Sequence, residues 1–357
     1  MSAVNTLRSW TNFLKRDLLP DLHGHLLKSV AAMSFAMASS GHCHSTRLSL
    51  CVPGTALPTS SRRRWERLLS NPRLRPERSF EQICRLLGSS WAGRRITIIV
   101  DETDRDQELR SLRIGVGYRH RMLPLLSIAY APNHPPLPMP QLLKRQLSRV
   151  HRWLGDDLEV TVLADRGLAW PVVVRLCERF GWHYVLRVQS GTRVKIDAHE
   201  QPLGELAPRR GAHYRAFGEV FKKQGWMAVA VTAVWEERCA EPWLLISDLP
   251  GGYARCRTYC KRMWCEQSFR DEKSEGFHWD KSRVQDVPHA TRLLLLMALA
   301  TLLCISMGVQ IVKRGLRHVL DCHVPRLLSY FQLGLRWLVW TQQERMLPPL
   351  PLSRVPP

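Results

Sequence analysis

Residues 259–273 read YCKRMWCEQSFRDEK and include neither proline nor glycine, so a helix is predicted for this segment. At about 100° per residue, five side chains share one narrow stripe of that helix: Tyr259, Arg262, Glu266, Arg270 and Lys273. One carboxylate among three cations and a phenol makes a poor hydrophobic face, but it suits a surface that grips phosphate and offers a carboxylate to a metal ion. The alternative is a solvated ladder of i, i+4 salt bridges.

Upstream of this segment, the sequence predicts a sheet whose strands are interspersed with helices. Residues 96–100 (ITIIV) form a β-branched run typical of a buried strand, and Asp101 follows it. Residues 158–164 (LEVTVLA) predict a second such strand, and Asp165 follows that one. Further strands are expected at 113–119, 122–130 and 182–188, and helices at 141–154 and 168–180.

The aspartates Asp101 and Asp165 therefore occupy equivalent places after two hydrophobic strands. If the two strands lie side by side and parallel, both carboxylates emerge at the same edge of the sheet, where α/β proteins bind their ligands. For a single aspartate after a strand, the usual interpretation is a turn or a helix cap. Two aspartates at matching positions favour a shared metal site.

The region between this sheet and the helix at 259–273 has a different pattern. Residues 190–250 contain short alternating runs separated by polar turns, which predict a β-rich insertion. The insertion contains Trp235 and Trp243, which are interpreted first as residues of a hydrophobic core.

The N-terminal residues 1–90 read as short helices rich in arginine. One of these helices is expected to begin at a serine cap, in the sequence SSRRRWERLL that starts at Ser60. Three consecutive cations on it, Arg62, Arg63 and Arg64, are interpreted as DNA contacts. The alternative is a solvated helix that packs through its apolar residues.

The overall charge points to a polyanionic partner. Lysine and arginine number 52 against 31 acidic residues, which gives a formal net charge of +21 and a pI near 10.2. This excess favours nucleic acid first and an anionic membrane surface second, and it argues against a metabolic enzyme for small neutral substrates. The ten cysteines include no C-x-x-C pair, and the tract His42-Cys43-His44 is a weak metal candidate.

One apolar run raises the question of a membrane. Residues 293–312 carry no charge and are long enough for a transmembrane helix. Polar residues within the run and the lack of a second span favour a helix buried in a large soluble core. The N-terminus lacks the apolar core of a secretory signal, and scattered cysteines fit free thiols, so a cytoplasmic, nucleoid-associated protein with no membrane partner is expected.

The spacing Y-x2-R-x3-E-x6-K, carried by Tyr259, Arg262, Glu266 and Lys273, resembles the signature of bacterial insertion-sequence transposases. Those proteins are DDE enzymes with a ribonuclease-H-like core, and the resemblance covers about residues 55–340. It implies an α/β fold with a ribonuclease-H-like mixed sheet, helices on both faces, a β-rich insertion before the last catalytic helix, and a helical N-terminal DNA-binding region.

The resemblance also implies roles for individual residues. Asp101, in a D-x-T context, is similar to the first acid of the catalytic triad, Asp165, in LADRG, to the second, and Glu266 to the third. These three would also be the ligands of two Mg²⁺ ions, which Mn²⁺ can replace. Phosphates near the scissile bond would be held by Tyr259, Arg262, Lys273 and, from geometry alone, Arg270. Four neighbouring acids are rivals and are interpreted as surface or cap residues: Glu102, Asp104, Asp106 and Asp271.

The implied reaction is cleavage of the ends of an insertion sequence and their joining to target DNA, with cut-and-paste through a DNA hairpin as one route. A flipped base would then stack on Trp235 or Trp243. The partners would be transposon-end DNA and target DNA, bound by a homodimer assembled on paired ends.

The predicted boundaries are 1–90 for the helical DNA-binding region, 91–189 for the first part of the core, 190–250 for the insertion, 251–315 for the signature and buried helices, and 316–357 for a C-terminal helical region with a proline-rich tail. Three other functions remain open. They are a metal-dependent nuclease of the same fold, a non-catalytic DNA-binding relic or inhibitor of transposition, and a basic membrane protein anchored through the apolar run.

Overall fold

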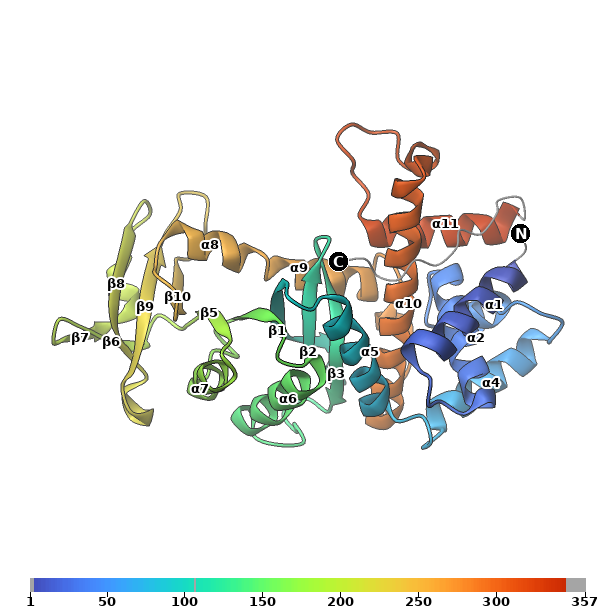
Figure 1. Cartoon of the computed structure of the whole chain (residues 1–357), viewed down its shortest axis with the longest axis horizontal. Coiled ribbons are helices and arrows are strands. Elements are labelled where there is room, and N and C mark those ends of the chain that lie inside the picture. Colours follow the sequence, from blue (N-terminus) through green and yellow to red (C-terminus); the bar gives the residue numbers. More distant parts are fainter. Residues whose placement is uncertain (1–2, 106, 345–357) are drawn as a thin grey trace.

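The computed structural model describes residues 3–105 and 107–344. Asp106 and the predicted proline-rich tail, residues 345–357, lie outside the described residues. Within the described chain, a long mixed sheet extends from one end of the molecule to its middle, and a helical bundle occupies the other end (Figure 1).

The first five strands follow the predicted order along the chain. Their order in the sheet is β3 (Arg121–Tyr130), β2 (Leu109–Tyr118), β1 (Arg95–Arg105), β4 (Glu159–Ala164) and β5 (His183–Arg187). Strands β1, β2 and β3 are antiparallel, whereas β1 pairs with β4, and β4 with β5, in parallel. The expected parallel neighbours are therefore present.

Strand β1 is longer than its hydrophobic run. Val100 lies opposite Ala164 in the parallel ladder, so Asp101 and Asp165 come next at the same level of the sheet. The expectation that the strand ends before Asp101 is wrong, because Asp101 and the four residues after it pair with β2. A long antiparallel partner thus carries β1 past the point where its parallel neighbour stops.

The strands of the insertion, most of which the alternating runs predict, extend the same sheet. They are β6 (Arg193–Ile196), β7 (His199–Pro202), β8 (His213–Val220), β9 (Met227–Val234) and β10 (Trp243–Ser247). β10 pairs antiparallel with β5, and the order continues through β9, β8, β6 and β7 to give ten strands. The short β7 was not predicted, because its sequence HEQP lacks the apolar alternation of a strand.

Helices cover the two faces of the first five strands. Helices α5 (Pro76–Ser90), α6 (Met139–Leu154) and α7 (Pro171–Phe180) pack on one face. Helices α8 (Tyr253–Cys260) and α9 (Met263–Lys273) lie against the other. Successive β1 residues alternate between these faces, so that Ile99 joins the cluster under α9 while its neighbours join the main core. Asp101, two residues after Ile99, faces α9 as well.

Helix α10 (Val287–Lys313) contains the apolar run and confirms the expected buried helix. It is long and apolar enough to cross a membrane, yet 89% of its most apolar window is buried inside the protein. It lies between β3 on one side and α2 (Gly24–Ser40) and α11 (Tyr330–Glu344) on the other (Figure 1). Gly308 and Gly334 allow α10 and α11 to approach, because a Cβ at either position would collide with the backbone of the opposite helix.

The N-terminal helices pack beside α10. They are α1 (Ala3–Phe13), a π-helical turn (Leu14–Leu18), α2 (Gly24–Ser40), α3 (Ser45–Leu50) and α4 (Pro58–Ser70). The predicted serine cap is wrong: α4 begins at Pro58, whose fixed φ suits the first helical position. Short 3₁₀ helices complete the chain at Leu203–Leu206, Lys222–Gln224, Trp279–Lys281 and Leu316–Val319.

Candidate active site

The segment 259–273 is helical, but it is divided between two helices. Tyr259 lies in α8, which already begins at Tyr253, whereas Glu266, Arg270 and Lys273 lie in α9. The break falls at Lys261 and Arg262, which keep right-handed helical dihedral angles. The single continuous helix predicted from the sequence is therefore corrected to two helices, which both pack on the face of the sheet that Asp101 also faces.

Three carboxylates from distant parts of the chain meet at the guanidinium of Arg262. Nη2 lies 2.8 Å from Oδ2 of Asp101 and 3.3 Å from Oδ2 of Asp165, and Nη1 lies 3.2 Å from Oε1 of Glu266. Asp101 comes from β1, Asp165 follows β4, and Glu266 lies in the first turn of α9. The structure thus brings together the three acids that the sequence singled out.

Burial disfavours the charged forms of the side chains in this cluster. Asp101 is 6% exposed, and burial raises its pKa although Arg262 and the Cys265 thiol oppose the rise. Burial also works against the charge of Arg262, but Asp101 and its other anionic neighbours outweigh it and raise the pKa of the guanidinium. Asp165 and Glu266 keep more exposed side chains, 28% and 41%, on the open side of the cluster.

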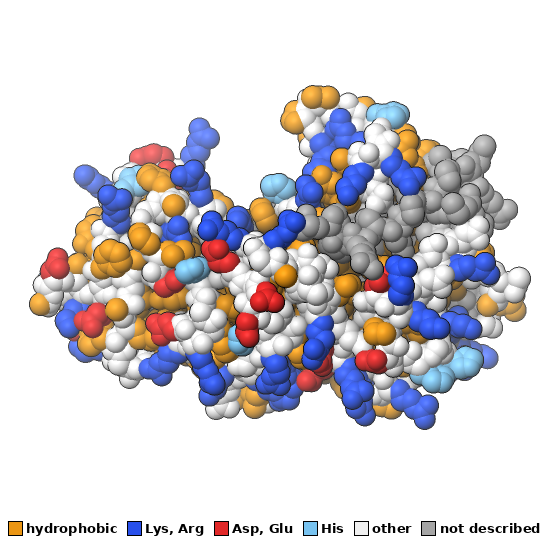
Figure 2. All heavy atoms as spheres, in the orientation of Figure 1, with side chains coloured by type: hydrophobic (Ala, Val, Ile, Leu, Met, Phe, Trp, Pro, Cys, Tyr) orange, Lys and Arg blue, Asp and Glu red, His pale blue; other side chains and the backbone are white. Residues whose placement is uncertain are grey.

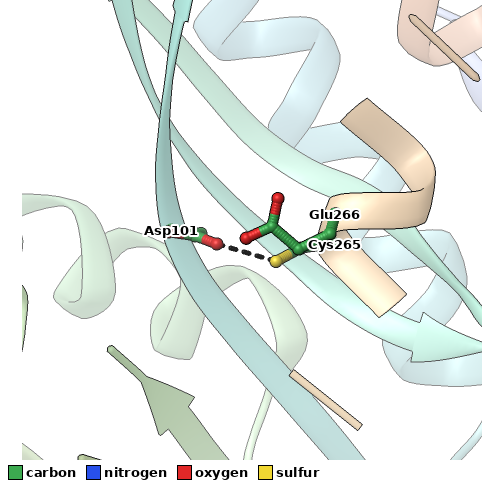
Figure 3. Close-up of side chains that lie close together, drawn as sticks. All are labelled: Asp101, Cys265 and Glu266. Atoms are coloured by element: carbon green, nitrogen blue, oxygen red, sulfur yellow. Dashed lines mark hydrogen bonds between the residues drawn. The ribbon is translucent and has the colours of Figure 1, made fainter. Parts of the chain in front are cut away.

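Cys265 is a member of this site that the sequence reasoning missed. Its Sγ lies 2.7 Å from Oδ2 of Asp101, and one ligand atom from each of Asp101, Cys265 and Glu266 lies within 4.8 Å of the others (Figure 3). Burial and the nearby Asp101 raise the pKa of the thiol, so it remains protonated and donates to the carboxylate. In the sequence, the one feature that could have pointed to Cys265 is its position immediately before Glu266.

The carboxylates fit a hard divalent cation better than a soft one. Asp101, Asp165 and Glu266 supply oxygen ligands of the kind that Mg²⁺ and Mn²⁺ prefer. The protonated Cys265 thiol is a weak ligand beside them, since metals bind the thiolate.

The chain's relation to known proteins agrees with this geometry. The family model of the transposase DDE domain matches residues 104–303, more than half of the chain. The chain belongs to this family. The matched part of the DDE domain includes Asp165 and Glu266 and begins three residues after Asp101. The mixed sheet is consistent with a ribonuclease-H-like transposase domain. No curated protein matches the chain significantly.

Tyr259 and Trp243 lie next to the cluster of three acids. The Tyr259 hydroxyl donates to Oδ1 of Asp165 over 3.3 Å, and its ring lies edge-on to Trp243 with the centroids 5.3 Å apart. Burial, followed by Asp165, raises the pKa of Tyr259. Trp235 follows Val234, the strand partner of Trp243, but packs against the main core on the other face of the sheet and donates its indole N–H to the carbonyl of Cys239. Both tryptophans are half-buried.

The two predicted cations of α9 differ in their surroundings. Lys273 is half-buried, and burial lowers its pKa while Asp104 and Glu266 act in the opposite direction. Arg270 is exposed to solvent. Lys273 therefore belongs to the rim of the acidic cluster, and Arg270 stands on the outer side of α9.

The rival acids have other partners. Glu102 accepts a hydrogen bond from Tyr130, and Asp104 pairs with Arg110 at 2.6 Å on the surface, as expected. The interpretation of Asp271 as a surface or cap residue is wrong, because it is 3% exposed. Asp271 pairs with Arg121 and accepts from Gln332, so this carboxylate ties α9 to β3 and α11.

A strongly cationic groove lies in the N-terminal part of the chain. It has a volume of about 900 Å³ and runs between α2, α4 and the start of α5. Six cations line it: Lys28, Arg64, Arg67, Arg73, Arg75 and Arg78. Arg64 is half-buried, and its Nε donates to Oγ of Ser29; burial and then Arg67 lower its pKa. Arg62 and Arg63 do not line the groove, and Arg62 pairs with Glu66.

The metal-ligand candidates of the tract at 42–44 are engaged in packing. The His42 ring stacks on His278 with the centroids 4.2 Å apart, and the buried Cys43 directs Sγ at the carbonyl of His278. Among the described residues, the cluster that could hold a metal ion is instead the one that contains Asp101 and Glu266.

Proposed function

We propose that this member of the transposase DDE family cuts the ends of a bacterial insertion sequence and joins them to target DNA. The observation that carries the proposal is the convergence of Asp101, Asp165 and Glu266 on one guanidinium, at the point where the parallel pairing of β1 and β4 ends. The spacing Y-x2-R-x3-E-x6-K supports membership of the insertion-sequence group that bears this signature.

Two Mg²⁺ ions, or Mn²⁺ in their place, would be held by the carboxylates of Asp101, Asp165 and Glu266. When bound, such ions supply an activated water or 3′-hydroxyl for attack on a phosphodiester and stabilise the departing 3′-oxygen. The carboxylate oxygens that would bind these ions are the oxygens that now contact Arg262. Once they bind the ions instead, the Arg262 guanidinium would be free to bind the scissile phosphate. Tyr259 supports this by orienting Asp165 through its hydroxyl.

The remaining DNA contacts follow from charge. Lys273 and Arg270 would bind phosphates beside the acids. The N-terminal groove would bind the DNA of the element end through Arg64 and its five cationic neighbours. Trp235 or Trp243 would receive a flipped base if the reaction passes through a hairpin. Paired ends would be held by a homodimer, and the protein would act on DNA in the cytoplasm, at the nucleoid.

Two alternatives use the same site differently. A metal-dependent nuclease would cleave DNA without joining ends, and a DNA-binding relic or inhibitor of transposition would bind without cleaving. The clustering of all three acids favours catalysis over the inhibitor. Incubation of cut ends with target DNA and Mg²⁺ separates the transposase from the nuclease, because only strand transfer yields joined products.

The decisive experiment compares Glu266→Gln with Glu178→Gln, an exposed acid on α7 at the opposite face of the sheet. Cleavage of a duplex that carries the element's own end, with Mg²⁺, is expected to fall more than about 100-fold in Glu266→Gln, because even outer partners of metal ligands cost 10–100-fold. DNA binding should change little in both. Full cleavage by Glu266→Gln would refute the proposed site.

The N-terminal groove has its own matched pair of variants on one helix. Arg64→Gln with Arg67→Gln removes two groove cations, whereas Arg62→Gln with Arg63→Gln removes two cations that do not line it. The slope of log affinity against log salt for end DNA should fall by about 2 in the first pair. Equal slopes in the two pairs would contradict a DNA contact in the groove.

A further inference from the structure

A second cationic groove lies beside α9. It has a volume of about 740 Å³ and is enclosed by the β2–β3 turn, α9, the segment before α11, and α11 itself. Four arginines line it: Arg119, Arg121, Arg326 and Arg336. Lys and Arg side chains predominate over Asp and Glu on the face of the molecule shown in Figure 2.

The charge of this groove is only partly neutralised. Arg121 pairs with Asp271, and Glu275 is the carboxylate among the groove's own lining residues. Arg119, Arg326 and Arg336 have no ion pair within the part of the chain that the structure describes. Three guanidiniums facing one unpaired carboxylate leave a net positive site, which attracts a polyanion rather than a neutral ligand.

The arginines of the groove are held in place before any ligand arrives. The guanidinium of Arg119 lies 5.1 Å, and that of Arg326 4.0 Å, from the centroid of the Tyr330 ring. Arg119 and His120 both adopt positive φ, which closes the turn between β2 and β3 in two residues. The two like charges therefore gather at one aromatic ring although they come from segments two hundred residues apart.

A buried carboxylate shapes the segment that carries Arg326. Oδ2 of Asp321 accepts the backbone N–H groups of Leu327 and Leu328, and Oδ1 accepts that of His323. Asp321 is 3% exposed, and these backbone hydrogen bonds lower its pKa to about 2. The segment is thus folded around the ionised carboxylate of Asp321. Arg326 lines the groove and has no carboxylate partner among the residues that the structure describes.

The groove and the acidic cluster lie on neighbouring faces of α9, about 100° apart around the helix axis. Glu266 reaches the acids through Arg262, whereas the next residue, Gln267, lines the groove. An α-helix is about 10 Å wide with its side chains, so DNA that runs from the acids to the groove has to cross only one helix. Arg270 is exposed on the outer side of the same helix. A DNA strand that leaves the acids and crosses α9 therefore passes Arg270 before it reaches the arginines of the groove.

We propose that this groove binds the phosphate backbone of the DNA that passes over α9 beside the scissile bond. The inference rests on the proposed function, since it takes the acids as the place of cleavage. The groove recognises phosphodiesters, which both element-end DNA and target DNA supply, so the two DNAs are separate arms of the test.

The test replaces Arg119, Arg326 and Arg336 by Gln in one variant. The matched control replaces Lys144, Arg145 and Arg179 by Gln, which removes the same charge from exposed positions on α6 and α7 at the opposite face of the sheet. Affinity for an element-end duplex and for a duplex of unrelated sequence is measured without divalent cations across a range of salt concentrations. Circular dichroism and thermal unfolding check that both variants fold.

The groove variant is expected to lower the slope of log affinity against log salt by about 2–3 for the element-end duplex alone or for both duplexes, whereas the control leaves both slopes near the wild-type values. A loss confined to the element-end duplex assigns the groove to that DNA, and a loss seen also with the unrelated duplex assigns it to target DNA. Unchanged slopes for both duplexes, or an equal fall in the control, would overturn the proposal. Binding is measured without cleavage, so this test does not depend on activity. If the wild-type protein failed to cleave DNA, the proposed function would be refuted, but the measured binding by the groove would still stand.

Discussion

The buried ion pair between Arg113 and Glu272 is expected to anchor α9 to the sheet. Nη2 of Arg113 lies 2.6 Å from Oε2 of Glu272, and the side chains are 0% and 5% exposed. Burial lowers the pKa of Arg113 and raises that of Glu272, and each partner opposes the shift of the other. Ser111 and Ser127 accept further N–H groups of the guanidinium, which is thereby fixed in β2.

Removal of Glu272 alone should be costly because the charge of Arg113 would stay buried without a counter-charge. For a buried pair broken in this way, the loss in free energy of unfolding is about 3–5 kcal/mol. The pair Arg62–Glu66 provides the comparison, since its side chains are 58% and 56% exposed. Loss of such an i, i+4 pair costs about 0.3–0.5 kcal/mol, so Glu272→Ala should destabilise the protein roughly ten times as much as Glu66→Ala.

The assay is urea unfolding followed by tryptophan fluorescence, for wild type, Glu272→Ala, Glu66→Ala and the double variant Arg113→Met with Glu272→Met. The double variant should recover most of the stability that Glu272→Ala loses, because apolar residues of similar volume leave no buried charge. If Glu272→Ala and Glu66→Ala lowered the free energy of unfolding by similar small amounts, the reasoning from burial would be refuted.

Three further predictions concern thiols, protons and a surface segment. Iodoacetamide at about pH 8 is expected to label the exposed Cys260 but not Cys265, which is buried and whose pKa burial raises; equal labelling in peptide mass spectra would contradict this packing. Burial, chiefly, lowers the pKa of His42 from 6.5 to about 4. As the pH drops through this interval, the unfolded chain takes up a proton before the folded protein does, so the free energy of unfolding should fall. An NMR titration of the folded protein in which the His42 ring has its midpoint near 6.5 would refute this prediction. The pKa of Asp321 is lowered to about 2 by backbone N–H groups, first that of Leu328, so its contribution to stability persists at neutral pH and is lost as the pH falls from 3.8 through 2. Asp321→Ala should accordingly speed hydrogen exchange of the Leu328 amide at neutral pH, and unchanged exchange would count against the described hydrogen bonds.

Local patterns predicted the core of the sheet well because its strands are unusually apolar. Buried parallel strands read as continuous hydrophobic runs, so β1 and β4 and the aspartates after their runs could be located from sequence. The extension of β1 beyond Asp101 could not be, because it depends on pairing with β2. Asp271 was misjudged for a similar reason: its partner, Arg121, comes from a strand 150 residues away.

The site itself divides in the same way. The signature spacing picked out Tyr259, Arg262 and Glu266, yet the break between α8 and α9 and the contact of Arg262 with all three acids are properties of the packed helices. Cys265 had no pattern to mark it, since its role depends on the proximity of Asp101.

From sequence alone, this chain is a basic α/β protein with two aspartates after hydrophobic strands and a glutamate on a cationic helix, because hydrophobic periodicity and charge are properties of neighbouring residues. Which groups meet is a matter of tertiary structure. The guanidinium between three carboxylates and the groove that joins Arg119 to Arg326 both bring together residues far apart in the chain, and only the closure of the sheet, α9 and α11 around one core sets those distances.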